Sequence, residues 1–233
     1  MPMTPSKRFR INKEAEIQSK NNTDGENEQT GNAYELQLIQ LSDHKRQLKQ
    51  TQSIERKKEL KAKMLPDYEP YVSGILEADS GAQDEIMMTI MLWRIDAGDI
   101  SGALEIAEYA LRHNLTPPEQ FKRDTATLIA EEVAEQTTNL DQLVITLDLT
   151  RDKDMPDEVR AKLHKAIGIN IGDNNYDEAL HHLNRALELH QGSGVKKLIE
   201  QFTRAKKKSD ELKTEKPETN TEQKTELDPE VPA

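Results

Sequence analysis

Residues 98–111 read GDISGALEIAEYAL, and residues 174–187, which begin 76 positions later, read NNYDEALHHLNRAL. Both stretches open with turn-forming residues and continue with apolar residues at helical spacing. Ala103 in the first stretch and Ala179 in the second are small enough to let two helix backbones approach closely. A helix pair of this kind cannot bury its apolar stripe alone, so the repeated piece predicts a unit that stacks on neighbouring helices.

The first repeated piece completes a helical hairpin. Ser80 and Gln83 fit a capping box, which predicts the start of a helix just before a wide apolar stripe. That stripe consists of Ile86, Met87, Ile90, Met91 and Trp93. Gly98 and its neighbours supply the turn. The returning helix is expected to pack through Ala103, Leu104, Ala107, Ala110 and Leu111.

A second hairpin follows the same logic. The sequence MPDE at 155–158 opens a helix, and residues 172–175 turn the chain. The apolar positions of its two helices are Val159, Leu163, Ala166, Ile167, Ala179, Leu180, Leu183, Ala186 and Leu187. The stretch DNNYDEALHHLNRALEL at 173–189 resembles the second half of a tetratricopeptide repeat. Two such degenerate units do not form a regular array.

Further helices are expected between the two hairpins. The sequence TPPE at 116–119 has a capping residue, proline and an early acid, which together predict a helix start. Residues 125–136 and 140–149 are predicted to be helical. The fold class that follows is all-α, with stacked helical hairpins that resemble degenerate tetratricopeptide units.

One long helix is predicted for residues 33–65. This stretch contains neither Gly nor Pro, consists mostly of good helix formers, and is followed by Pro66. Its apolar residues become rarer toward its end, where basic side chains gather. The basic residues are Lys45, Arg46, Lys49, Arg56, Lys57, Lys58, Lys61 and Lys63.

Composition divides the chain into four parts. Of its 233 residues 34% are apolar and 32% are charged, so a core that uses the whole chain is not expected. Residues 1–32 and 206–233 are predicted to be a disordered arm and a disordered tail, because their composition offers little to bury. The long basic helix at 33–65 and a helical-hairpin core at 66–205 lie between them.

Charge is distributed unevenly along the chain. The net charge of −11 argues against nucleic-acid binding, but residues 66–160 contain 7 Lys and Arg against 21 Asp and Glu, whereas residues 1–65 contain 13 against 9. The basic half of the long helix is therefore a candidate DNA-phosphate site, with a solvated, flexible helix as the alternative. A second basic cluster consists of Lys196, Lys197, Arg204, Lys206, Lys207 and Lys208.

Candidate catalytic or metal-binding residues are weaker. The acids Asp148, Asp152, Asp154, Asp157 and Glu158 would suit a nuclease metal site if they converged, but acids are also favoured at a helix start. The six histidines form no metal-binding motif, and there is no Gly-rich phosphate loop, so an ATPase site is excluded. We therefore expect no catalytic residue, no metal and no cofactor.

Other features bear on compartment and assembly. The chain has no cysteine, which excludes disulfides and agrees with a reducing compartment. No apolar run is long enough to cross a bilayer, and no signal peptide is recognisable, so no membrane association is expected. The Trp and Met residues of the first hairpin give it more apolar surface than two hairpins of one subunit are expected to cover, which predicts a homo-oligomer.

A family resemblance adds to this reading. Residues 81–116, GAQDEIMMTIMLWRIDAGDISGALEIAEYALRHNLT, resemble the small terminase subunits of temperate, contractile-tailed bacteriophages. DMPDEVRAKLHKAIG at 154–168 and GVKKLIE at 194–200 are similar to the same family. The resemblance extends over roughly residues 65–200. It departs at the end of the chain, where residues 214–233 are acidic although family members end with a basic tail.

The resemblance implies a role in viral DNA packaging. Small terminases oligomerise, bind the packaging site on viral double-stranded DNA, and recruit the large terminase subunit, which carries the ATPase. An endonuclease role in cohesive-end cutting is an alternative implied by the same family, and the host cytoplasm is the implied location. An adaptor that binds only protein is the alternative from another class, because tetratricopeptide-like units commonly have that function.

Overall fold

The computed structural model describes residues 10, 13 and 28–214, and in this part of the chain the secondary structure is helical throughout. The all-α fold class is therefore confirmed. The α-helices are α2 (Glu28–Gln50), α3 (Ile54–Met64), α4 (Glu69–Ala78), α5 (Glu85–Ala97), α6 (Ile100–Arg112), α7 (Thr125–Gln136), α8 (Leu140–Leu149), α9 (Asp157–Ile171), α10 (Tyr176–Leu189) and α11 (Lys196–Thr214). Two short 3-10 helices are η1 (Leu65–Asp67) and η2 (Gly172–Asn174).

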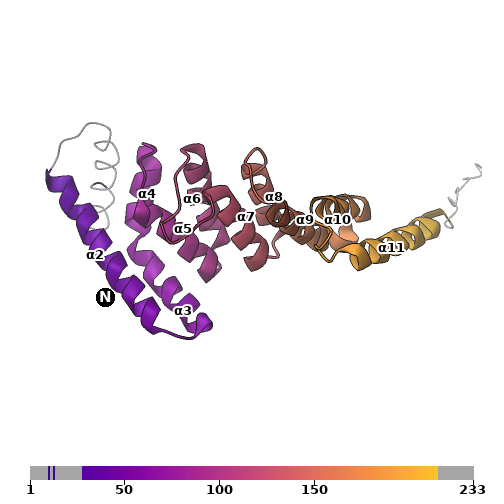
Figure 1. Ribbon diagram of the computed structural model, residues 1–233, viewed down its shortest axis with the longest axis horizontal. Coiled ribbons are helices and arrows are strands. Elements are labelled where there is room, and N and C mark those ends of the chain that lie inside the picture. The colour runs from indigo at the N-terminus through magenta and orange to yellow at the C-terminus, as the bar shows by residue number, and fades with distance from the viewer. Residues whose placement is uncertain (1–9, 11–12, 14–27, 215–233) are drawn as a thin grey trace, which may run out of the picture.

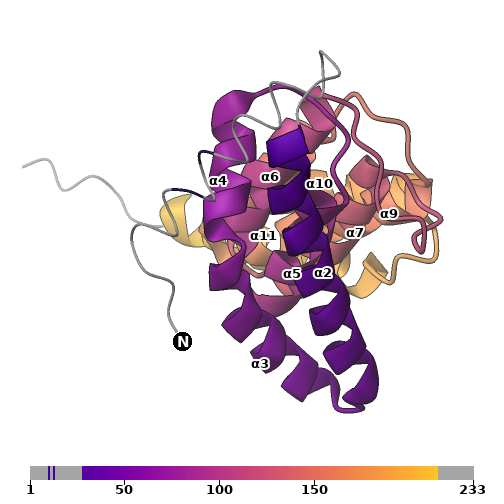
Figure 2. The same ribbon diagram turned by 90° about the vertical axis from the view of Figure 1, so that its left-hand side faces the viewer.

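The helices are arranged as an elongated row. Figure 1 shows α2 and α3 at one end, α4 to α8 in the middle, and α9, α10 and α11 toward the other end. Viewed from the α2 end, α2 and α3 form an outer layer in front of the remaining helices (Figure 2). The two ends of the row are thus built by different parts of the sequence.

The prediction of a single helix for residues 33–65 is wrong. Two helices, α2 and α3, form a hairpin with its tip at residues 51–53. The Thr51 hydroxyl donates to the Gln47 carbonyl at 3.1 Å, and the Ser53 side chain accepts a hydrogen bond from the Arg56 amide. Ser and Thr side chains compete for the backbone in this way and can end or begin a helix without Gly or Pro.

The repeated piece adopts the same local structure twice. In the first hairpin Asp99 caps α6 by accepting from the Gly102 amide, and in the second Asn175 caps α10 by accepting from the Glu178 amide. The two caps are 76 residues apart, as are Ala103 and Ala179, which are both buried. The two hairpins, α5–α6 and α9–α10, are therefore equivalent units. Their likeness to tetratricopeptide units stays a prediction.

Two predicted helix starts are wrong, and the two segments concerned contact each other. Asp84, not Ser80, caps α5, and residues 116–119 belong to the connection between α6 and α7. The Gln83 side chain donates to the Thr116 carbonyl at 2.9 Å and accepts from its amide at 2.8 Å. These side-chain bonds give the Thr116 amide and carbonyl partners within the loop.

Helix α5 is the centre of the core. All ten residues from Ile86 to Ile95 are buried, which is typical of a helix covered on every side. Helices α2, α3, α6 and α7 all contact it. The Asp84 carboxyl at its start is also buried and accepts a hydrogen bond from the Tyr71 hydroxyl, and burial raises the pKa of this carboxyl.

This burial removes the reason for which an oligomer was expected. Trp93 and the methionines of α5 are covered within one chain and leave no open apolar face. In the described part of the chain, the large apolar side chains that remain exposed lie elsewhere: Leu36, Ile39, Ile54, Val144, Ile145 and Ile169.

The boundaries of the predicted tail and arm also change. Helix α11 continues to Thr214, so residues 206–214 belong to a helix and not to the tail. Helix α2 begins at Glu28, within the predicted arm. The rest of the predicted tail, residues 215–233, and most of the predicted arm lie outside the described residues.

Candidate nucleic-acid interface

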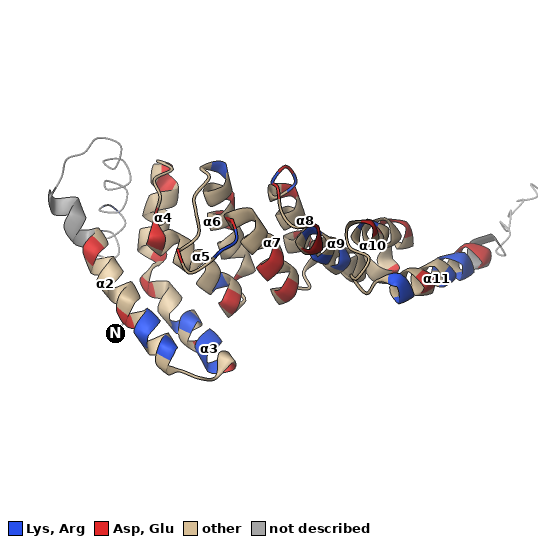
Figure 3. Cartoon of the chain, viewed as in Figure 1, with Lys and Arg blue, Asp and Glu red and all other residues tan. Residues whose placement is uncertain are grey.

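The α2–α3 hairpin carries all eight predicted DNA-binding residues. Lys45, Arg46 and Lys49 lie in the second half of α2, and Arg56, Lys57, Lys58, Lys61 and Lys63 lie on α3. Figure 3 shows these residues gathered at the end of the row where the two helices join. The structure therefore brings the predicted set together, although two helices supply it.

Three of the eight are fixed to the body of the protein. Lys45 forms an ion pair with Glu85 at 2.7 Å, and Lys61 forms one with Asp96. Lys58 donates to the Gln136 side chain at 2.9 Å. The Lys61 side chain is only 16% exposed, so little of its charge faces solvent. These lysines fasten the hairpin to α5 and α7.

Arg46 has a partner on its own helix. It forms an ion pair with Asp43 at 2.7 Å, and both side chains are mostly exposed. An exposed pair of this kind contributes about 0.3–0.5 kcal/mol, so a phosphate can compete for the guanidinium at small cost.

The remaining four cations have no ion pair or side-chain hydrogen bond within the described part of the chain. They are Lys49, Arg56, Lys57 and Lys63, and we call them the open cations. Lys49, Arg56 and Lys57 flank the hairpin tip. Lys49, Arg56 and Lys63 are exposed, and Lys57 is partly exposed. The structure thus divides the predicted set of eight into groups that the sequence does not distinguish.

Aromatic and polar contacts position the hairpin on the body. His44 Nδ1 lies 2.8 Å from the Tyr68 hydroxyl, and both rings lie near Trp93. Burial lowers the pKa of His44, which favours the neutral ring in this contact. Gln40 donates to Asp67 at 3.2 Å. These residues carried no signal in the sequence, because each partner lies on a different element.

The second basic cluster lies at the opposite end of the row, on α11. Lys206 forms an ion pair with Asp177 of α10, whereas Arg204 is 3.9 Å from Glu200 on its own helix. The pKa of Lys206 is raised, chiefly by its hydrogen bond to Asp177. The cluster is thus separate from the hairpin.

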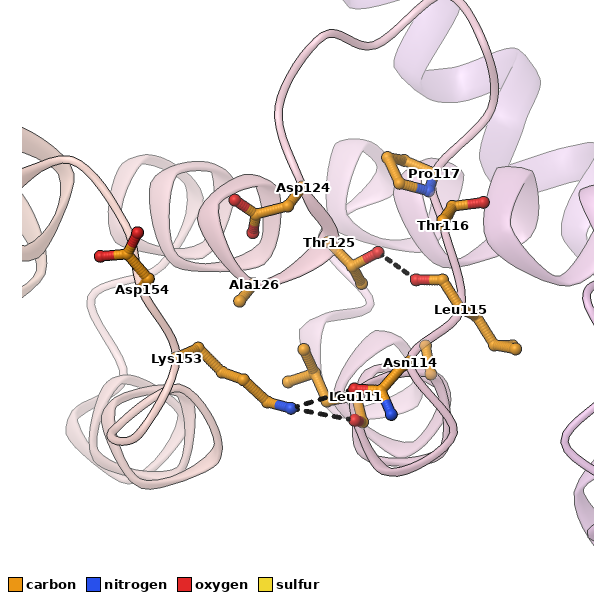
Figure 4. A pocket seen from close by; sticks show the side chains of 11 residues that line it. Leu111, Asn114, Leu115, Thr116, Pro117, Asp124, Thr125, Ala126, Lys153 and Asp154 are labelled. Carbon is orange, nitrogen blue, oxygen red and sulfur yellow. Dashed lines mark hydrogen bonds between the residues drawn. The ribbon is translucent and has the colours of Figure 1, made fainter.

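The acids that were candidates for a nuclease metal site take different roles. Asp148 pairs with Arg151, while Asp157 and Glu158 lie in the first turn of α9, where the helix dipole favours acids. Asp154 lies at a pocket of about 360 Å³ that Lys153 enters (Figure 4). Among the described residues no three His, Asp or Glu side chains gather as metal ligands.

The Figure 4 pocket lies between the end of α6 and the start of α7. The Lys153 ammonium donates to the Leu111 carbonyl at 3.3 Å and lies 3.4 Å from the Asn114 side-chain oxygen. Asp124 caps α7 and bonds Thr127 through both of its oxygens. Lys153 and Asp124 therefore have structural partners in this pocket.

One histidine contact was missed. His164 of α9 and His182 of α10 approach with their Nδ1 atoms 2.9 Å apart. Burial and the neighbouring His182 lower the pKa of His164 to about 4. The two residues are 18 positions apart, so only the packing of the second hairpin reveals the pair.

Comparison with known proteins identifies a matching family and a relative. A family described as phage small terminase subunit matches residues 38–158, which include most of the α2–α3 hairpin. The "Terminase, endonuclease subunit" of Escherichia phage P2 is 46% identical over an alignment of 181 residues that covers 73% of each chain. No solved structure matches the chain. No helix in the described residues has the length and apolar character needed to cross a bilayer.

Proposed function

The chain belongs to the phage small terminase subunit family, and from this membership we propose that it binds the packaging site of viral double-stranded DNA and delivers that DNA to the large terminase subunit. The observation that carries the DNA-binding part is the set of four open cations on the hairpin. Cations without a protein partner can exchange their counterions for DNA phosphates without first breaking an ion pair.

The chemistry of the hairpin favours phosphate contacts. Its exposed groups are mainly point charges on flexible side chains, which fix the position of a protein on a duplex and carry little sequence information. Four phosphate contacts would give a log–log salt slope of about −3.6, so that raising salt from about 50 to 200 mM would weaken binding about a hundredfold. Assembly into an oligomer that presents several hairpins would steepen this dependence.

The test uses the neighbouring residues Lys57 and Lys58 as a matched pair. Both are lysines of α3, but Lys58 bonds Gln136 and Lys57 is an open cation. Lys57→Ala is expected to reduce the magnitude of the salt slope by about 0.9 per bound hairpin, whereas Lys58→Ala leaves it nearly unchanged. Fluorescence anisotropy of the full chain with duplex DNA across a salt series measures both.

Larger variants extend the same test. Replacing all four open cations by alanine is expected to weaken binding to packaging-site and random DNA alike. Lys45→Ala combined with Lys58→Ala removes two anchored lysines from the same hairpin and serves as the control. Equal losses from anchored and open cations would overturn the assignment of the site.

We also propose that the protein acts as a homo-oligomer. Family membership supports this, together with the exposed apolar side chains of Leu36 and Ile39 on α2, which are 59% and 61% exposed. A second copy that covers them would remove apolar surface from water. Light scattering at tens of micromolar protein tests the proposal, and a monomer there would exclude it.

An endonuclease role is the second candidate, because the phage P2 relative is named an endonuclease subunit. We expect the isolated chain to have no strong nuclease activity, since Asp148 pairs with Arg151 and no three His, Asp or Glu side chains gather as metal ligands among the described residues. Cognate DNA incubated with the chain and Mg²⁺ is the test. Cleavage that is lost in an Asp152→Ala, Asp154→Ala, Asp157→Ala variant would assign the cutting to this subunit.

A further inference from the structure

Helix α11 presents a second basic surface far from the hairpin. It packs through Val195 just before it and Phe202 within it, which are both buried, and the Phe202 ring contacts Tyr176 of α10. Lys206 extends along this packed side and pairs with Asp177. Leu198 and Ile199 also pack against the core, and the opposite side of the helix is exposed.

The outward side of α11 carries a row of cations. Lys197, Arg204 and Lys208 follow one another at intervals of seven and four residues, which places them on one helix face opposite Phe202. All three are exposed, and Arg204 has only the long contact to Glu200. Helix α11 also carries Glu200, Asp210 and Glu211, but its described side chains include six Lys and Arg against these three acids.

The two basic ends are separated by an acidic body. Residues 66–160 contain 7 Lys and Arg against 21 Asp and Glu, and they lie between the hairpin and α11 (Figure 3). A duplex laid along the row would pass close to this body, and repulsion acts within about 8–10 Å at physiological salt. A straight duplex therefore does not reach both ends favourably.

We propose that α11 is a second DNA-phosphate-binding element and that one chain holds two DNA segments, one at each end. The inference rests on the proposed function for the hairpin end, whereas the α11 end is independent of it. The two segments could belong to one long DNA or to separate molecules. Helix α11 also lies outside the residues that the family comparison matches.

The experiment measures bridging by the full chain. A short biotinylated duplex is fixed to beads, and retention of a second, fluorescent short duplex is recorded at low salt. Lys197→Ala combined with Arg204→Ala and Lys208→Ala is expected to reduce retention at least tenfold while the protein still binds a single duplex. Gln201→Ala, an exposed neutral position on the same side of α11, is the matched control and retains bridging.

Each outcome has a defined meaning. Undiminished bridging by the α11 variant would overturn the proposal, because the second duplex would then be held by another copy in an oligomer. Absence of bridging by the unaltered chain would also overturn it. Circular dichroism and solution mass confirm that the variant keeps its fold and assembly.

The two DNA-binding proposals can fail separately. The variant without the four open cations is expected to lose bridging while α11 still binds a single duplex. If that variant binds and bridges like the unaltered chain, the hairpin assignment fails. The α11 variant remains the test of the second site.

Discussion

The α5–α6 and α9–α10 hairpins are alike along the inner seam, where their two helices pack on each other, and differ on their outer faces. Positions 76 residues apart on the seam are apolar and buried in both, as in Met87 and Leu163 or Ile95 and Ile171. On the outside, buried Trp93 corresponds to Ile169, which is 43% exposed. Met88, which is fully buried, corresponds to the half-buried His164.

The difference follows from position in the row. Helix α5 is contacted by α2, α3, α6 and α7, whereas α9 is contacted chiefly by α10, α7 and α8. The two helices of a hairpin pack on each other through apolar residues, whether the hairpin lies in the middle of the row or toward its end. The outer face is apolar only where further helices cover it, so the same unit can serve as a core or as one end of the row.

The largest effect expected from this comparison is at Trp93 and Ile169. Trp93→Ala would leave a cavity in a covered helix and reduce the free energy of unfolding by about 3–5 kcal/mol. Ile169→Ala removes a side chain that is already 43% exposed, and a loss of at most about 1 kcal/mol is expected. Urea denaturation of both variants gives the two values. Similar losses at the two sites would contradict the distinction between covered and open faces.

The next largest effect concerns two facing positions of the hairpins, one small and one large, whose residue sizes are exchanged between the first hairpin and the second. Gly168 lies against α10, and a methyl group on it would come within 2.8 Å of Leu183 Cγ and 3.0 Å of the Ala179 carbonyl oxygen. The corresponding pair in the first hairpin is Leu92 and Ala107, so the large and small residues are exchanged. Gly168→Ala is expected to destabilise the protein by about 1–3 kcal/mol through overpacking.

A double variant sharpens this test. Leu183→Ala opens the space that Gly168→Ala fills, so the combined loss is expected to be smaller than the sum of the two single losses. Simple additivity in urea denaturation would show that the two positions are not coupled. The close approach of α9 and α10 would then not depend on this glycine.

The two helix caps test whether the units are equivalent in local structure. Asp99→Ala and Asn175→Ala each leave one amide at a helix start without its side-chain acceptor. Each change is expected to cost about 1 kcal/mol. Thermal unfolding of the two variants measures the effects side by side. A loss at only one position would show that the caps are not equivalent.

Local features of the fold were predictable from the sequence, because their signals lie within a few residues. Helices α7 and α8 have the bounds that the sequence predicts, and the turns predicted around Gly98 and at residues 172–175 lie between the helices of the two hairpins. The break between α2 and α3 was missed, because Thr51 and Ser53 end and begin helices through backbone contacts that composition does not reveal.

The candidate site was predictable only as a group of residues. The eight basic positions do gather on one hairpin, but Lys61 and Asp96 are 35 residues apart in the sequence. Whether a lysine is anchored or open depends on such distant partners. Packing of the hairpin on α5 and α7 therefore decides which cations are available, and periodicity alone does not contain that information.

Acid pH is expected to produce the smallest effect in this comparison, through His164 of the second hairpin. His164 has a pKa of about 4 in the folded protein, against an ordinary value near 6.5, because it is partly buried beside His182. A lowered pKa means that the folded state binds fewer protons, so this contribution to stability is complete above about pH 6.5 and is lost as pH falls toward 4. Partial solvent exposure limits the loss to the order of 1 kcal/mol.

The comparison with Met88 provides the control for this pH dependence. Met88 stands at the corresponding position and does not titrate, so this position of the first hairpin adds no such pH dependence. Arg160 and Arg185 also oppose protonation of His164, whereas Glu178 favours protonation of His182. His164→Met would copy the first hairpin into the second, and its unfolding free energy is expected to fall less steeply between pH 6.5 and 4 than that of the unaltered chain. Urea denaturation at a series of pH values measures the slope, and identical slopes would show that the contact between His164 and His182 does not govern acid stability.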